Sequence, residues 1–240
     1  MWKLILIVAL LFSIWSIVGV YEPHPEVIDS LKSSESVDYV YEHGWMVFKS
    51  KKCYIEKRIG MIFLPGAKVD ARSYASLCHG IVERANGTLD MCVLAQVPMN
   101  LAIFAKSLPS EIAKTYPYIQ SWIIAGHSLG GAMGCEIVND LHKENPDLWV
   151  AAETLAAYCP ETSQVKILAF QGTNDGVQTM SEFQSHDFPN DATIVYIDGG
   201  NHSQMGAYGP QKGDGVANIS MVEQHDIIID ETVEFLNTLV

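Results

Sequence analysis

The chain has 240 residues, 48% hydrophobic and 18% charged, which excludes intrinsic disorder over most of its length and suits one α/β domain. Its net charge of −13, with no concentrated run of Lys or Arg, argues against nucleic acid as a partner. The five cysteines include no C-x-x-C pair, so they predict no zinc site. Because their number is odd, at least one thiol is free or bonded to another chain, and we expect buried, apolar thiols.

The N-terminal segment is apolar, and Lys3 is the only charge between Trp2 and Val20. A helix of this length spans about 28 Å, close to the ~30 Å hydrocarbon thickness of a bilayer. The sequence therefore predicts an uncleaved membrane anchor over residues 1–20. A cleaved signal peptide is the alternative, but such segments are shorter, and Ile17-Val18-Gly19 is a poor cleavage site.

The charges that flank this segment suggest its orientation. Lys3 precedes it, and Glu22 and Glu26 follow it, which favours a cytoplasmic N-terminus and an extracytoplasmic domain. Under the signal-peptide alternative the protein would be secreted. The polar, proline-containing stretch 21–36 is expected to be a tether, and residues 37–240 form the folded domain.

Strands and helices alternate along most of the domain. A hairpin is expected first, over Val37–Tyr41 and Trp45–Phe48. The strands that follow are apolar throughout, as is typical of a mostly parallel sheet with helices on both faces. The predicted strands are Ile59–Leu64, Met91–Val97, Trp122–Ala125, Glu153–Tyr158, Val165–Phe170 and Thr193–Ile197. The predicted helices are Ala71–Arg84, Leu101–Tyr116, Leu129–His142, Gln178–Phe188 and Ser220–Val240.

A G-x-S-x-G motif follows one of these strands and opens a helix. It comprises Gly126 to Gly130, with Ser128 at its centre. A strand-to-helix turn this tight strains the backbone of the serine and leaves space only for glycine two residues before and after it. The pattern predicts Ser128 as a nucleophile. His127 belongs to the same turn and is expected to be structural.

A serine nucleophile needs a base, and the base needs an orienting acid. Asp175 and His202 each follow a predicted parallel strand, so both are expected at the same sheet edge as Ser128. We predict His202 as the general base and Asp175 as the acid. Asp187 and Asp191 are weaker candidates because they precede a strand.

The oxyanion of such a reaction needs backbone donors. The N–H of Leu129 is one candidate, and the N–H of Ala67, in the loop after Ile59–Leu64, is the other. The loops at this edge also suggest a small substrate pocket. The residues expected to contact substrate are Lys68, Met99, Asn100, Gln204, Met205 and Tyr208.

These motifs resemble the alpha/beta hydrolase fold-5 group of the α/β-hydrolase superfamily, which is distantly similar to dienelactone hydrolases. The similarity covers nearly all of the chain after the anchor. It is carried by residues 63–70, 97–102, 126–131, 172–177 and 199–204. The resemblance implies the α/β-hydrolase fold with Ser128, Asp175 and His202 as a triad. Dienelactone hydrolases use a cysteine nucleophile, so their substrate is not carried over.

The expected function is that of a membrane-tethered serine hydrolase, an esterase that hydrolyses small acyl esters through an acyl-enzyme. The short connection between Tyr158 and Val165 leaves no room for a helical lid. No metal or organic cofactor is predicted. The alternatives are a non-catalytic binding module with the same fold and an acyltransferase or peptidase that uses the same triad.

Overall fold

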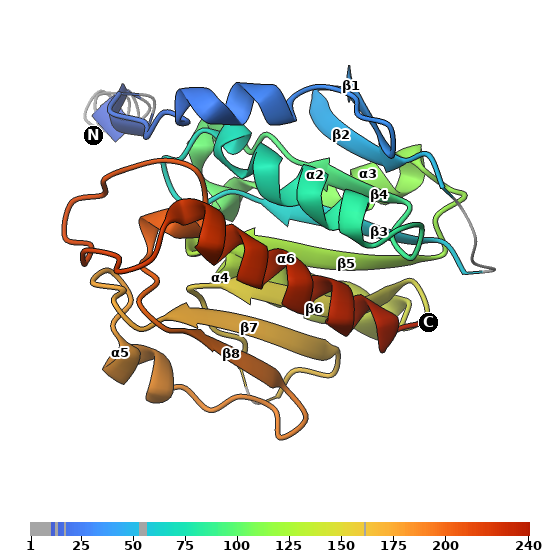
Figure 1. The fold of residues 1–240 in the computed structure, drawn as a ribbon. Coiled ribbons are helices and arrows are strands. Elements are labelled where there is room, and N and C mark those ends of the chain that lie inside the picture. The colour runs from blue at the N-terminus through green and yellow to red at the C-terminus, as the bar shows by residue number, and fades with distance from the viewer. Residues whose placement is uncertain (1–10, 13, 17, 53–56, 161) are drawn as a thin grey trace, which may run out of the picture.

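A computed structural model describes residues 11–12, 14–16, 18–52, 57–160 and 162–240 (Figure 1). Within these residues, eight strands form one sheet in the order β1-β2-β4-β3-β5-β6-β7-β8. The β1–β2 and β2–β4 pairs are antiparallel and the other neighbours are parallel. The strands are β1 (Val37–Glu42), β2 (Trp45–Ser50), β3 (Ile59–Leu64), β4 (Met91–Leu94), β5 (Ser121–His127), β6 (Trp149–Leu155), β7 (Lys166–Gly172) and β8 (Thr193–Ile197).

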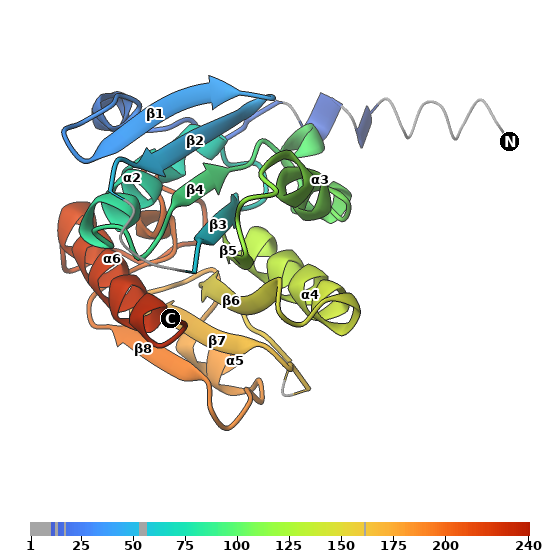
Figure 2. The same cartoon turned by 90° about the vertical axis from the view of Figure 1, so that its right-hand side faces the viewer.

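Helices cover both faces of the sheet (Figure 2). Helices α2 and α6 contribute to the apolar core on one face, and α3, α4 and α5 contribute to the core on the other. The central strands β3, β4 and β5 are buried at every residue, as their apolar sequences require. The predicted hairpin and the predicted mostly parallel sheet are confirmed. The α-helices are α2 (Ala75–Arg84), α3 (Leu108–Thr115), α4 (Leu129–Glu144), α5 (Met180–Gln184) and α6 (Met221–Asn237).

Several boundaries differ from the predictions, and for two helices the reason is local. The helix expected from Leu101 begins at Leu108, because Pro109 lacks a backbone N–H and fits best in a first helical turn. Helix α5 begins at Met180, where Thr179 and Glu182 form a capping box. Strand β4 ends at Leu94 instead of Val97, and β6 begins at Trp149 instead of Glu153. The remaining short helices are the 3₁₀ turns Pro25–Ser30, Ala71–Tyr74, Pro98–Asn100, Ala102–Phe104 and Ser203–Met205.

The predicted anchor, residues 1–20, lies mostly outside the described residues. In the part of the chain that the structure describes, no helix is both long enough and apolar enough to cross a membrane. The described part of this segment exposes several large apolar side chains, namely Leu11, Phe12, Ile14, Trp15 and Val18.

The segment 21–36, which the sequence suggested as a tether, packs against the domain. Tyr21 forms a parallel bridge with Val69, and Pro23 forms an antiparallel bridge with Tyr208. The ring of Tyr21 also lies 5.6 Å from that of Tyr208, centroid to centroid. The segment therefore joins the loop after β3 to the loop after β8.

A disulfide bond joins Cys135 on α4 to Cys159, just beyond β6. Both residues are buried, as expected, and α4 packs directly on β6, which brings their sulfur atoms together. Cys78 and Cys92 are free and buried, as expected. Cys53 lies outside the described residues.

An acidic side chain is buried in the middle of the sheet. Glu153 on β6 is 1% exposed, and neither carboxyl oxygen has a well-formed hydrogen bond among the described residues. Strand alternation directs it to the same face as Ala151 and Leu155, which belong to the core under α2 and α6. Burial raises the pKa of Glu153 to about 8, although the nearby Thr232 hydroxyl acts in the opposite direction. The carboxyl is therefore protonated at neutral pH.

This burial predicts a pH-dependent stability. Because the folded state keeps the Glu153 proton up to about pH 8 and the unfolded chain loses it near pH 4.5, the free energy of unfolding falls as pH rises across that interval. Glu153→Gln removes this fall, which amounts to at most ~1.4 kcal/mol per pH unit. Urea unfolding at several pH values across and above that interval measures it. Glu234→Gln, on the exposed face of α6, serves as the control and should follow the wild type. If the free energy of unfolding fell with pH equally in the wild type and in Glu153→Gln, the raised pKa of Glu153 would be contradicted.

Candidate active site

Ser128 sits in a strained turn between β5 and α4. Its φ and ψ are 51° and −121°, a conformation that L-residues rarely adopt. The neighbouring glycines show why the turn is so tight. A Cβ on Gly126 would lie 2.5 Å from the carbonyl carbon of Gly130, and a Cβ on Gly130 would lie 2.2 Å from the Leu64 oxygen. Only glycine fits at these two positions, and the resulting geometry presents the serine at the carboxyl edge of the sheet.

His202 and Asp175 form a buried pair beside this turn. The Nδ1 of His202 lies 2.8 Å from Oδ2 of Asp175, and both side chains are almost fully buried. The other carboxyl oxygen of Asp175 accepts hydrogen bonds from the N–H groups of Val177 and Gln178. Because the carboxylate faces Nδ1, that nitrogen carries the proton of the neutral imidazole, and the Nε2 lone pair is free to accept one.

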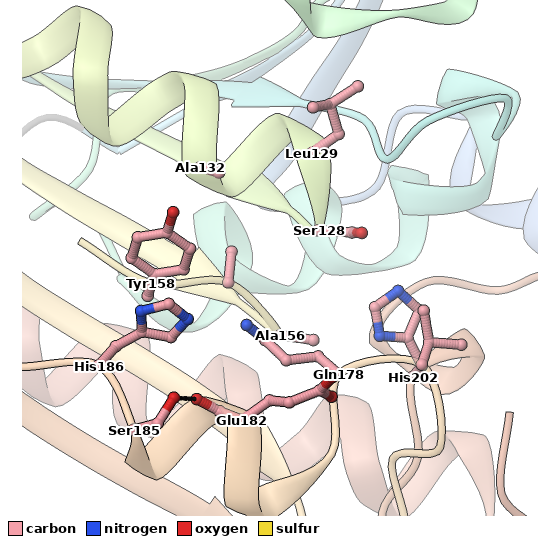
Figure 3. Close-up of a pocket in the computed structure, with 12 residues that line it drawn as sticks. Ser128, Leu129, Ala132, Ala156, Tyr158, Gln178, Glu182, Ser185, His186 and His202 are labelled. Atoms are coloured by element: carbon pink, nitrogen blue, oxygen red, sulfur yellow. Dashed lines mark hydrogen bonds between the residues drawn. The ribbon is translucent and has the colours of Figure 1, made fainter. Parts of the chain in front are cut away.

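Ser128 and His202 line the same cavity, and Figure 3 shows the serine hydroxyl facing the imidazole ring. The cavity has a volume of about 370 Å³ and opens to solvent. Its lining residues are Ser128, Leu129, Ala132, Ala156, Ala157, Tyr158, Val177, Gln178, Glu182, Ser185, His186 and His202. The arrangement places a hydroxyl, an imidazole and a buried carboxylate in the order that nucleophilic catalysis requires.

The two expected oxyanion donors flank the turn. Within the described residues, the backbone N–H groups of Ala67 and Leu129 make no hydrogen bond. The Ala67 loop is fixed by the neighbouring Gly66, whose N–H donates to the Tyr74 hydroxyl at 3.1 Å. That hydroxyl in turn lies 2.8 Å from Nδ1 of His127.

The role of His127 follows from this chain of hydrogen bonds. The Tyr74 hydroxyl thus contacts both the Gly66 N–H and Nδ1 of His127. Burial, and the nearby His202 to a lesser extent, lower the pKa of His127 well below its usual value. His127 is therefore neutral, and it links the serine turn to the Ala67 loop.

Comparison with known proteins identifies the architecture. The model of the alpha/beta hydrolase family matches residues 60–226, more than half of the chain. The chain belongs to this family. Comparison with curated protein sequences gives no match.

Solved structures similar to this alpha/beta hydrolase include several hydrolases. A predicted CIB-like hydrolase from Thermoplasma acidophilum has a TM-score of 0.57 at 14% identity, over 84% of this chain and 97% of that one. An esterase from Pyrobaculum calidifontis has a TM-score of 0.57 at 10% identity, over 95% and 91%. An esterase/lipase from an uncultured bacterium has a TM-score of 0.53 at 12% identity, over 89% and 88%. At these identities the similarity shows a shared fold.

The substrate-contact residues expected from the sequence lie elsewhere in this hydrolase. None of the six lines the cavity beside Ser128. Met205 is fully buried in the core and Tyr208 is 2% exposed, because the loop after β8 turns inward beneath Tyr21. The Gln204 amide donates to the Ile219 carbonyl.

Lys68, Met99 and Asn100 also lie outside the lining of the cavity. The Lys68 ammonium lies 4.5 Å from the centroid of the Trp15 ring. Met99 and Asn100 both have positive φ, and the Asn100 carbonyl accepts the Lys68 N–H at 2.8 Å. The cavity is walled instead by residues that follow β6 and by residues on and around α5, which no sequence motif marks.

Asp214 is a further residue of the site that the sequence analysis missed. Its Oδ1 accepts the N–H groups of Gly176 at 3.3 Å, His202 at 3.2 Å and Gly215 at 2.8 Å. Its Oδ2 accepts the N–H of Ser203 at 2.8 Å. One carboxylate thus ties the loop that carries Asp175 to the loop that carries His202.

A buried amide supports the same loop from α6. The Gln224 side chain accepts the N–H of Asn201 at 3.0 Å and donates to the Asn201 carbonyl at 2.8 Å. Because Asn201 directly precedes His202, helix α6 also helps to fix the backbone that carries the His202 imidazole.

Loss of the Asp214 acceptor should impair turnover more than folding. Asp214→Ala leaves four backbone donors without their carboxylate, and a small displacement of His202 can lower kcat by about 10²-fold. Steady-state kinetics with p-nitrophenyl acetate, alongside a thermal melt, measures both effects. Asp187→Ala removes an exposed aspartate outside these loops and should behave as wild type. Equal activity of the two variants would show that Asp214 does not position the histidine.

Proposed function

We propose that the chain is a serine hydrolase that cleaves carboxylic esters of small molecules through an acyl-enzyme. The observation that supports this most directly is the single cavity in which Ser128, in a strained turn, faces His202, whose Nδ1 is held 2.8 Å from Asp175. Several solved structures of similar fold are esterases, which agrees with this substrate class.

In the proposed first half-reaction, Nε2 of His202 takes the proton of Ser128 while Oγ attacks the ester carbonyl carbon. The developing oxyanion lies near the N–H groups of Leu129 and Ala67. The imidazolium, stabilised by Asp175, then donates its proton to the leaving alkoxide, and the acyl group stays on Ser128. In the second half-reaction, water donates a proton to His202, attacks the acyl carbon, and releases the acid and the free serine.

We propose that the preferred acyl groups are short. The segment between β6 and β7 is a loop in its described residues, so no helical lid covers the cavity there. A cavity of about 370 Å³ whose floor is formed by small side chains such as Ala132, Ala156 and Ala157 suits a small acyl group.

We further propose that the enzyme is anchored to a membrane by residues 1–20, with its catalytic domain outside the cytoplasm. The apolar sequence of this segment and the exposed Phe12 and Trp15 beyond residue 10 support the anchor. The Cys135–Cys159 disulfide supports an oxidising compartment. Secretion after cleavage of the segment is the alternative.

The nucleophile is tested by Ser128→Ala. Removal of the hydroxyl should abolish ester turnover, with a loss on the order of 10⁴-fold or more, because no acyl-enzyme can form. Hydrolysis of p-nitrophenyl butyrate and a thermal melt provide the measurements. Ser185→Ala, which removes another hydroxyl from the same cavity, is the matched control and should retain turnover. Normal turnover by Ser128→Ala would contradict the assignment of Ser128 as the nucleophile.

The anchor is tested by fractionation. The full-length protein should sediment with membranes and resist carbonate extraction, because about 28 Å of apolar helix matches the bilayer core. A chain of residues 21–240, which keeps the Tyr21 and Pro23 contacts, should be soluble and active. A mature N-terminus mapped near Val20 would instead indicate a cleaved signal.

A further inference from the structure

We propose that Tyr158 and His186 form an end wall that sets the acyl-length limit of this enzyme, an inference that rests on the proposed esterase function. Their rings stack with centroids 3.7 Å apart and planes 7° apart. Both line the cavity that holds Ser128. Figure 3 shows the pair at the end of the cavity away from His202.

The position of His202 decides which part of the ester meets this wall. The imidazole must give its proton to the leaving oxygen, so the alcohol portion lies on the His202 side of the scissile carbon. The acyl chain is bonded to the same carbon and extends to the other side. There it crosses the small side chains of Ala132 and Ala156 and reaches Tyr158.

A second hollow begins on the far side of Tyr158. It has a volume of about 480 Å³ and shares Ala132 and Tyr158 with the catalytic cavity. Met133 and Pro160 provide apolar surface in it, and Glu136 and Asp140 provide polar surface. Tyr158 is therefore the side chain that stands between the catalytic cavity and a larger space along α4.

Two features hold the wall in place. Cys159, the residue after Tyr158, is bonded to Cys135 on α4, which fixes the backbone of the tyrosine. His186 follows α5, whose start is fixed by the Thr179–Glu182 capping box. A stacked pair with both backbones anchored is a fixed barrier, so a chain longer than the cavity gains no buried surface beyond it.

Removal of the wall should join the two hollows and shift the acyl preference. In Tyr158→Ala, octanoyl carbons can reach the apolar surface near Met133, and each buried methylene adds to binding, so the ratio of kcat/KM for octanoate to that for butyrate should rise at least about tenfold. Tyr158 is 39% exposed, so its loss leaves the core intact. Tyr158→Phe keeps the ring and should keep the wild-type ratio.

The measurement is kcat/KM for p-nitrophenyl esters from acetate to dodecanoate with each variant. Tyr41→Ala, which removes another exposed tyrosine, on β1 and outside the cavity, is the control and should follow the wild type. In Tyr158→Ala/Met133→Trp, the indole should fill the second hollow and reverse the gain.

The outcomes separate the end wall from the proposed function. A rise in the octanoate ratio that Met133→Trp reverses supports the wall. An unchanged ratio in Tyr158→Ala with normal butyrate turnover overturns the wall and leaves the esterase proposal standing. A wild-type enzyme already most active on dodecanoate also overturns the wall. Failure of the wild type on every ester overturns the proposed function itself.

Discussion

The site depends on the close packing of β5, α4 and the end of β3. A Cβ on Gly130 would lie 2.2 Å from the Leu64 oxygen, so α4 begins in direct contact with the backbone of the neighbouring strand. The tight turn beside this contact holds Ser128 at positive φ. The same contact brings the loop after β3 beside the first turn of α4, where the N–H groups of Ala67 and Leu129 are unpaired among the described residues. Strain at the serine and the position of both donors thus have one cause.

The rest of the site is assembled at the same edge by hydrogen bonds to backbone groups. Asp175 follows β7 and His202 follows β8, and parallel pairing of these strands brings the two loops together. Asp214 then fixes their relative position through four backbone donors. The segment around Tyr21 closes the edge by bridging the loop after β3 to the loop after β8. Residues 21–23 thus help to hold both loops in place.

The parts of this arrangement that a sequence can reveal are those with short-range causes. The glycines around Ser128 and the apolar runs before Asp175 and His202 follow from local sterics and strand burial, so the sheet and the relative positions of these three residues could be predicted. The cavity walls could not, because Tyr158 and His186 come together only through the packing of two loops. The sequence suggested Met205 and Tyr208 beside the substrate because no local signal shows that their loop turns inward. Asp214 carries no motif, and its role appears only in three dimensions.

The essential step of the proposed mechanism is that Ser128 becomes covalently bonded to the substrate acyl group. Its most direct test is to treat the wild-type protein with a fluorophosphonate, digest it, and map the adduct by mass spectrometry. We expect a single phosphonylated residue, Ser128, in the peptide that spans the start of α4, with labelling lost when Asp175 or His202 is replaced by alanine. A stable adduct on another residue, or undiminished labelling after loss of His202, would contradict it.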